Sequence, residues 1–157
     1  MKVELVRNRH SVGESNFHYQ LTPAYRQKIF ADEKVQKLTR AYFLAKANEL
    51  EVHISSLEFG PDHVHIFVAN CRKYAPSELI GILKGFVSRM MRKNHWILFK
   101  HLLYGDKFWT EGYFYRSIGA VTADAVKYYI ENSQDKHWEV VDYETYKHQE
   151  QKKLIDY

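Results

Sequence analysis

The sequence predicts an α+β fold of the split βαβ (ferredoxin-like or RRM-like) type, an antiparallel sheet with helices on one face. Three observations support this. Alternating and helix-spaced segments follow one another as strand, helix, strand, strand, helix, strand, helix. The length, 157 residues, suits one compact domain. No internal repeat or linker interrupts residues 17–135. The first six elements form the split βαβ unit, which leaves the second face of the sheet for a ligand.

The first half of the chain supplies one strand and one helix. Residues 1–16 lack periodicity and contain small, polar residues, so we expect a flexible N-terminal arm. The aromatic, alternating stretch FHYQLT predicts a strand over residues 17–22, and an irregular segment follows Pro23. Asp32 is placed to cap a helix that ends near Leu50.

The second half supplies three strands and two helices. VHISSLEF and HVHIFVA predict strands over residues 52–59 and 63–69, joined by a Gly-Pro-Asp turn. Pro76 opens a helix, because proline is tolerated in a first turn. The apolar stripe of this helix is predicted from Leu79, Ile82 or Leu83, Phe86 and Met90. After a less regular apolar segment, GYFYRSIG predicts a strand over 112–119, and Thr122 caps a final helix.

Composition excludes several classes of protein. Apolar content of 45% and charged content of 27% are ordinary for a soluble globular domain. Cys71 is the only cysteine, so the chain can form no internal disulfide, and we expect a reduced, cytoplasmic protein. No apolar run reaches the roughly 18 residues of a transmembrane helix, and the polar N-terminus does not resemble a signal peptide. The net charge of +4 is compatible with a nucleic-acid partner.

Two histidines in the strand HVHIFVA are the strongest chemical signal. Residues two apart on a strand share a face, so His63 and His65 point together while Val64 and Ile66 point into a core. Two imidazoles on one face suit a divalent metal whose remaining ligands are oxygens or waters. Two partly exposed histidines on an edge strand are the alternative. A histidine-triad hydrolase is excluded because Phe67 stands where the third histidine would be.

The turn before this strand decides which residues flank the histidines. A two-residue Gly60-Pro61 turn would pair Glu58 with His63 and place Ser56 on the same face. A three-residue turn would instead bring Leu57 and Phe59 beside the histidines. The hydrophobic pattern favours the first register, because it keeps the apolar residues on the core face. A carboxylate then lies next to the candidate ligands.

Two further features follow the histidines along the chain. The helix that begins at Pro76 carries a basic flank beside its apolar stripe, formed by Lys84, Arg89, Arg92 and Lys93. The final helix contains Tyr128 and Tyr129, and Tyr129 shares a stripe with Ala125 and Ser133, one turn away on either side. A tyrosine in a helix most often packs, so its combination with the histidine strand and the basic helix is what matters.

These features together resemble the single-tyrosine HUH transposases (TnpA type) of small prokaryotic insertion sequences, where U is a hydrophobic residue. PDHVHIFV matches the HUH strand and its turn, and LKGFVSRMMRKNH is similar to the basic helix that follows. FWTEGYFYRSIGAV resembles the segment before the catalytic helix, and YIENSQ resembles the tyrosine motif. TPAYRQKIF resembles the first strand and its continuation. The resemblance covers residues 17–135 and leaves 136–157 as a C-terminal tail.

The resemblance implies roles for individual residues. His63 and His65 correspond to metal ligands for Mg²⁺ or Mn²⁺, and Tyr129, on the C-terminal catalytic helix, corresponds to the nucleophile. The family usually has glutamine four residues after that tyrosine as a further ligand, but this chain has Ser133 there and Gln134 next. Gln134 lies about 100° further round the helix. Three candidates for the third metal ligand therefore remain, namely Gln134, water and Glu58.

The implied reaction is cleavage and rejoining of single-stranded DNA through a 5′-phosphotyrosine intermediate. The basic flank of the helix would neutralise DNA phosphates. The resemblance also implies hairpin-forming element ends as substrate and a homodimer that shares its active sites between subunits. The alternatives are a non-catalytic nucleic-acid-binding split βαβ module, a decayed transposase, and a replication initiator or relaxase, for which the chain is short.

Overall fold

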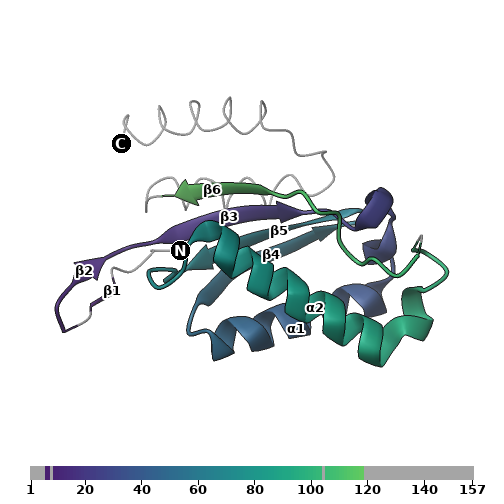
Figure 1. Ribbon diagram of the computed structural model, residues 1–157, viewed down its shortest axis with the longest axis horizontal. Helices are drawn as coiled ribbons and strands as arrows, with labels where there is room; N and C mark the ends of the chain where they lie inside the picture. The colour runs from purple at the N-terminus through teal and green to yellow at the C-terminus, as the bar shows by residue number, and fades with distance from the viewer. Residues whose placement is uncertain (1–5, 8, 104, 119–157) are drawn as a thin grey trace.

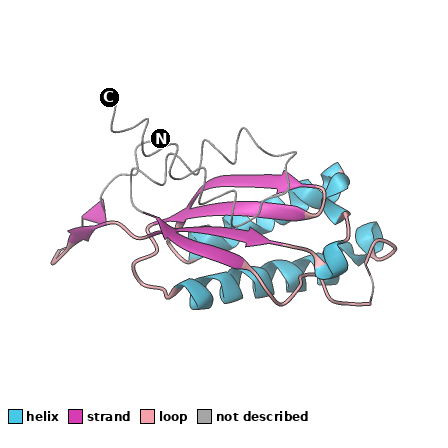
Figure 2. Cartoon of the chain, turned by 90° about the horizontal axis from the view of Figure 1, so that it is seen from above, coloured by secondary structure: helices cyan, strands magenta, loops and turns pink. Residues whose placement is uncertain are grey.

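The computed structural model describes residues 6–7, 9–103 and 105–118. Within them, a four-stranded antiparallel sheet carries two long helices on one face, which confirms the predicted fold class (Figures 1 and 2). The strand order is β4-β5-β3-β6. The strands are β3 (Asn16–Leu21), β4 (His53–Gly60), β5 (His63–Ala69) and β6 (Phe114–Ile118). The helices are α1 (Glu33–Glu49) and α2 (Pro76–Phe99). The predicted helix after Thr122 lies outside the described residues.

The N-terminal arm contains structure that the sequence pattern did not predict. Strands β1 (Val6–Arg7) and β2 (Val12–Gly13) pair antiparallel in a small hairpin that projects from one end of the sheet (Figure 1). Two residues per strand are too few for an alternation to be visible in the sequence. The irregular segment after β3 forms two short 3₁₀ turns, η1 (Ala24–Arg26) and η2 (Ile29–Ala31).

Helix α1 begins where its cap predicts. The Asp32 carboxylate accepts hydrogen bonds from the backbone N–H groups of Lys34 (2.8 Å) and Val35 (3.2 Å). These donors have no partner within a helix, so the cap satisfies both of them. The helix then buries Val35, Thr39, Phe43 and Ala47, spaced one turn apart, against the sheet and α2.

Helix α2 is longer than predicted, and its buried stripe is rotated. It continues through the segment expected to be irregular, as far as Phe99, with a kink at His95 (φ −134°, ψ 17°). Its buried residues are Leu79, Ile80, Leu83, Val87, Met91 and Phe99. The predicted stripe members Ile82, Phe86 and Met90 are only partly buried, since Phe86 packs on Tyr42 of α1 at 6.1 Å between ring centroids. Because α2 has two apolar rows, the sequence pattern does not show which of them faces the sheet.

The hydrophobic core lies between the helices and one face of the sheet, the helix face. From β5 it takes Val64, Ile66 and Val68, all fully buried. Tyr19 of β3 joins this core and donates a hydrogen bond from its hydroxyl to the Pro76 carbonyl at 2.8 Å, which fixes the start of α2 on the sheet. The alternate residues of the strands therefore form a second face, the histidine face. Its members include Asn16, His18, Gln20, Glu58, His63, His65, Phe67, Phe114 and Arg116.

Candidate active site

His63 and His65 lie on β5, in the interior of the sheet between β4 and β3. They share the histidine face, as the alternation predicted. The alternative of two partly exposed histidines on an edge strand is wrong, because β5 is an inner strand and His63 is 5% exposed and His65 3% exposed. A central strand has neighbours on both sides, and those neighbours enclose the two rings. The rings lie 5.1 Å apart between centroids and meet edge to face at 77°.

The register between β4 and β5 differs by two residues from the predicted one. The turn is Pro61-Asp62, so Gly60 pairs with His63, and Glu58 pairs with His65. A shift of two residues keeps every side chain on its face, while a shift of one would reverse them all. The prediction that Glu58 flanks the histidines, with Leu57 and Phe59 in the core, is therefore confirmed.

His63 is held by the turn that precedes it. Its Nδ1 lies 2.9 Å from Oδ1 of Asp62, and a carboxylate can only accept, so Nδ1 carries the proton. Arg26 approaches the other carboxylate oxygen at 3.7 Å. The Phe30 N–H donates to the Pro61 carbonyl at 3.0 Å and so fastens the turn to η2. The contact with Asp62 thus engages Nδ1 of His63 and not its Nε2.

The absence of a side chain at Gly60 leaves the space that the His63 ring occupies. The two residues are partners across the β4–β5 ladder, and the imidazole lies over the glycine backbone. A Cβ added at Gly60 would come within 2.7 Å of both ring nitrogens of His63, closer than real Cβ contacts. The ring can therefore occupy this position only because residue 60 has no side chain.

A third histidine, His18, stands beside His65 and was not predicted. It is fully buried on β3, and its Nε2 lies 3.3 Å from Nδ1 of His65. The two rings stack at 22°, with 5.4 Å between centroids. Phe114 of β6 meets the His18 ring at 5.7 Å between centroids. FHYQL places His18 opposite the core-facing Tyr19, but the β3–β5 pairing that brings His18 to His65 is not visible in the sequence.

Burial keeps the inner histidines neutral. Burial, with a smaller contribution from the positive charge of Arg116 on β6, lowers the pKa of His18 to about 3. It also lowers the pKa of His65 well below its ordinary value, with smaller contributions from His18 and His63. A metal ligand must be a neutral imidazole, because a protonated ring has no lone pair to donate. His65 is in that state at neutral pH.

The donor set fits two positions of a metal site. Asp62 and His18 lie against the Nδ1 atoms of His63 and His65, so both Nε2 atoms are directed away from those contacts. Metal-binding histidines commonly have this arrangement, with the second nitrogen engaged by another group. Within residues 6–7, 9–103 and 105–118, no three His, Cys, Asp or Glu side chains form a complete set of ligands. Further ligands must come from elsewhere, and Tyr129, Ser133 and Gln134 lie outside the described residues.

The predicted basic residues lie on α2, on the other side of the sheet from the histidines. Lys84 donates to the carbonyls of Thr110 (2.9 Å) and Glu111 (3.3 Å), just before β6. Burial lowers the pKa of Lys84, as does the neighbouring charge of Lys107, while Glu111 opposes the shift. Arg92 donates to the Asp106 carbonyl at 3.2 Å. These two cations therefore fasten the 105–112 loop to the helix.

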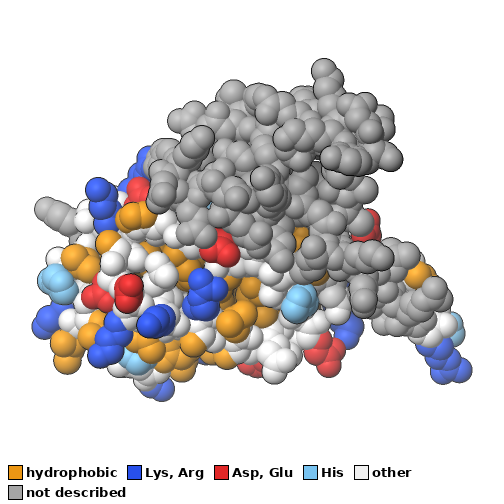
Figure 3. All heavy atoms as spheres, turned by 180° about the vertical axis from the view of Figure 1, so that it is seen from behind, with side chains coloured by type: hydrophobic (Ala, Val, Ile, Leu, Met, Phe, Trp, Pro, Cys, Tyr) orange, Lys and Arg blue, Asp and Glu red, His pale blue; other side chains and the backbone are white. Residues whose placement is uncertain are grey.

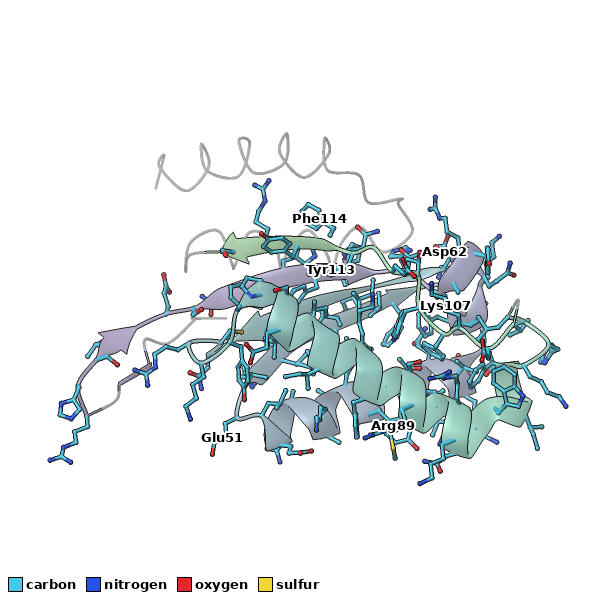
Figure 4. The ribbon with its side chains drawn as sticks, in the orientation of Figure 1. Glu51, Asp62, Arg89, Lys107, Tyr113 and Phe114 are labelled. Atoms are coloured by element: carbon cyan, nitrogen blue, oxygen red, sulfur yellow. The ribbon has the colours of Figure 1, made fainter. Side chains whose placement is uncertain are left out.

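The two remaining predicted cations are exposed. Arg89 lies 5.9 Å from the centre of the Phe86 ring, and Lys93 is on the helix surface. An open pocket of about 280 Å³ is lined by Lys84, Arg92 and Lys107, together with Phe108 and Trp109. Figure 4 shows Phe114 above the sheet and Arg89 below it, among the helices. The histidines and the basic helix are thus not brought together into one site.

Comparison with known proteins identifies the chain. The sequence profile of the family described as "Transposase IS200 like" matches residues 11–133. The chain belongs to this family. The matched region includes the histidine strand, the basic helix and Tyr129, so the transposase has the predicted motifs in one continuous family match.

The transposase is similar to several relatives that are named as transposases. It is 27% identical over 137 residues to "ISDra2 transposase TnpA" of Deinococcus radiodurans, covering 87% of this chain and 96% of that protein. It is 29% identical over 126 residues to "Transposase for insertion sequence element IS200" of Salmonella typhimurium, covering 78% of this chain and 81% of that protein. A crystal structure of a transposase candidate from Deinococcus radiodurans R1 superposes with a TM-score of 0.64 at 23% identity. That structure covers 81% of this chain and supports the same fold.

Family membership establishes the coarse function. The transposase is an enzyme that acts on DNA, and its activity is DNA cleavage and strand transfer. Among the described residues, no helix is both long and apolar enough to cross a membrane. On the side shown in Figure 3, basic, acidic and hydrophobic side chains are interspersed over the described part of the surface.

Proposed function

We propose that this transposase cleaves and rejoins single-stranded DNA at the ends of its insertion sequence, with Tyr129 as nucleophile and a divalent metal at His63 and His65. The observation that carries the proposal is the pair of neighbouring imidazoles on the histidine face, with a partner against each Nδ1. This arrangement, in an IS200-like transposase, is suited to hold a cation beside a DNA phosphate.

The covalent step transfers a phosphate between oxygens. The Tyr129 oxygen attacks the scissile phosphorus, a bond between them forms, and the bond to the 3′ oxygen breaks. This gives a 5′-phosphotyrosine and a free 3′-OH, because the phenol gives up its proton to solvent as the bond forms and the departing 3′ oxygen takes one up. A second 3′-OH then attacks the phosphotyrosine and releases Tyr129. No nucleotide cofactor is needed, because the covalent intermediate conserves the phosphodiester energy.

The histidine face supports this step electrostatically. A tyrosine has an unperturbed pKa of about 10, so its ionisation needs assistance at neutral pH. Bound Mg²⁺ or Mn²⁺ would polarise the scissile phosphate and offset its developing charge. His63 and His65 would bind the ion through Nε2, and Asp62 keeps the His63 ring in the required orientation.

The third ligand is the least defined part of the proposal. We favour Gln134 or water over Glu58. Glu58 lies opposite His65 on the correct face, but a further carboxylate would weaken the attraction of the site for phosphate. Metal affinities of Ser133→Gln, Gln134→Ala and Glu58→Ala separate these candidates. Tighter binding by Ser133→Gln would show that the natural site is incomplete, and loss of the metal in Glu58→Ala alone would reverse our order.

We also propose how the DNA and a second subunit take part. Lys84, Arg89, Arg92 and Lys93 would contact phosphates of the DNA, with hairpins at the element ends as the preferred substrate. Lys84 lies next to the residues just before β6, and β6 is an edge strand of the sheet. A DNA strand that contacted both α2 and the histidines would therefore pass around this edge. The tyrosine of one subunit in a homodimer would serve the histidines of the other.

A second candidate is a decayed transposase that binds DNA without cutting it. Ser133 favours this alternative, because a serine hydroxyl is a short, weak ligand where the family usually has glutamine. A non-catalytic split βαβ module would behave in the same way. Both would keep their DNA affinity after replacement of His63, His65 or Tyr129.

One experiment tests the proposal. Single-stranded DNA that carries the element end is incubated with the full chain and Mn²⁺, and the products are separated on a denaturing gel. The wild type should form a covalent adduct, and Tyr129→Phe should abolish it while DNA binding stays near the wild-type level. Tyr128→Phe is the matched control and should retain the adduct.

Two results would contradict the assignment. An adduct that is lost in Tyr128→Phe but kept in Tyr129→Phe would identify the neighbouring tyrosine as nucleophile. Tight DNA binding by the wild type, with no adduct in either Mg²⁺ or Mn²⁺, would favour the decayed enzyme.

A further inference from the structure

We infer that His18 is a positioning residue of the metal site, which holds the His65 ring so that its Nε2 is presented to the cation. The inference rests on the metal site of the proposed function. It adds a residue of β3 to a site whose candidate ligands in the sequence lie on β4, β5 and the predicted final helix. The contact that carries it is the 3.3 Å approach between Nε2 of His18 and Nδ1 of His65.

The His18 ring is fixed on several sides. Its backbone lies in the middle of β3, paired with Phe67 of β5 on one side and Arg116 of β6 on the other. Its side chain is fully buried, stacked on the His65 ring and met by the ring of Phe114. A side chain constrained by two strands and two rings is a rigid support for its neighbour.

The protons define the direction of the hydrogen bond. For His65 to bind a cation through Nε2, that atom must have its lone pair, so the proton of the neutral ring is on Nδ1. This N–H needs an acceptor in a buried site, where an unmade hydrogen bond is costly. Nε2 of His18 faces it and accepts when the His18 proton is on its own Nδ1. The pair can thus support the His65 tautomer that a cation on Nε2 requires.

His18 supports the metal site but does not itself bind the metal. To do so, its Nε2 would have to leave Nδ1 of His65. The described residues contain no group of three His, Cys, Asp or Glu side chains in metal-binding geometry, although His18, His63 and His65 are all among them. The geometry is that of a support behind one ligand.

The two ligands are then held by different chemical groups. His63 is held by the carboxylate of Asp62, which adds a negative charge that Arg26 partly offsets at 3.7 Å. His65 is held by a neutral imidazole, which adds no charge. A second carboxylate at that position would lower the net positive charge that the cation presents to a DNA phosphate. The neutral support therefore orients the ligand without reducing the attraction for substrate.

The test compares two substitutions at residue 18. His18→Leu keeps an apolar volume but removes the acceptor, and His18→Gln places a carbonyl oxygen at about the reach of Nε2. Val68→Ala is the matched control, because Val68 is buried on the same strand as His65 but on the helix face. Nitrogen NMR of the metal-free full-length protein reports the His65 tautomer, and calorimetric titration with Mn²⁺ reports metal affinity.

In the wild type and in His18→Gln, His65 should be predominantly protonated on Nδ1. His18→Leu should show mixed tautomers and bind Mn²⁺ about 10–100-fold more weakly. Val68→Ala should match the wild type in both measurements. An unchanged His65 tautomer and Mn²⁺ affinity within twofold in His18→Leu would overturn the inference. A loss of Mn²⁺ affinity in His18→Gln as large as that in His18→Leu would also overturn the inference, because it would identify His18 as a metal ligand. A wild type that binds no Mn²⁺ would refute the proposed metal site, whereas the tautomer readout would still decide the role of His18.

Discussion

The two faces of β5 are built by alternate residues of one strand and follow different rules. On the helix face, Val64, Ile66 and Val68 are buried among the apolar side chains of the core. On the histidine face, His63 and His65 are almost as deeply buried, yet their neighbours are polar or aromatic groups at defined distances. Burial on the helix face therefore fills space in an apolar core, whereas burial on the histidine face holds individual atoms in defined contacts.

The difference teaches which changes each face can accept. An apolar contact has no preferred direction, so the helix face tolerates side chains of similar size. The histidine face depends on individual atoms from three segments, namely β3, the Pro61-Asp62 turn and the end of β4. Substitutions on one face should therefore change stability, and those on the other should change chemistry.

The largest contrast is expected between two adjacent residues. His65→Ala should lower the rate of DNA cleavage by about 10²–10³-fold or more, because electrostatic stabilisation of the phosphate is lost. Ile66→Ala should lower the free energy of unfolding by about 2–5 kcal/mol, with a nearly normal cleavage rate per folded molecule. Urea unfolding and single-turnover cleavage measure the two effects. A His65→Ala variant that cuts DNA normally would remove the functional distinction between the faces.

A smaller effect is expected from the group that holds His63. Asp62→Ala should weaken Mn²⁺ binding by about 10–100-fold, because the His63 ring loses the acceptor for its Nδ1 proton. Glu51→Ala is the matched control, since Glu51 is an exposed carboxylate that pairs with Lys73 at 3.3 Å (Figure 4 labels both acidic residues). Titration of both variants with Mn²⁺ compares them. Equal affinities would mean that Asp62 does not orient the ligand.

The smallest effect is a pH dependence of stability confined to the histidine face. The folded-state pKa values of His18 and His65 lie below the ordinary 6.5. Protonation of these two histidines therefore does not lower the free energy of unfolding above pH 6.5. The free energy of unfolding should fall as the pH drops below that value, by up to about 1.4 kcal/mol per pH unit for each histidine. The charged or titratable groups on the same face are Arg116 on β6, His63 on β5 and Glu58, which pairs with His65 from β4. Urea unfolding of the metal-free protein between pH 7.5 and 5 measures this loss.

The variants His18→Leu and His53→Gln sharpen that measurement. His18→Leu should flatten the pH dependence, because one buried histidine no longer takes up a proton on unfolding. His53→Gln is the matched control, a histidine substitution at an exposed position of β4 away from the histidine pair. A flat profile in the wild type would mean that the two inner histidines titrate normally in the folded state.

The sequence was sufficient for whatever depends on local pattern. Alternation predicted β5 with its correct ends, and Asp32 predicted the start of α1. The sharing of a face by His63 and His65 also follows from alternation alone. By contrast, the central position of β5 depends on which strands pair, and the sequence pattern does not contain that information. The burial of both histidines was therefore missed.

The missed partners of the histidines have the same explanation. His18 is 47 residues from His65 in the sequence, and only the β3–β5 register brings them together. Asp62 is visible in the PDHVH motif, but the motif predicts only a turn residue, because the contact of Asp62 with His63 depends on the Pro61-Asp62 turn. The predicted apolar stripe of α2 was correct at Leu79 and Leu83 and wrong at Phe86 and Met90, because the helix has two apolar rows and contacts two layers.

The backbone opposite His63 has a consequence for how this enzyme can change over generations. At Gly60, every replacement available from the genetic code adds at least a Cβ, and that atom would meet the His63 ring within 2.7 Å of its nitrogens. No substitution of Gly60 is therefore compatible with the present position of the His63 imidazole. A lineage could silence its element by one such substitution while the histidines, the tyrosine and the basic helix all remain intact. An insertion-sequence copy that looks complete by its motifs should be checked at this glycine.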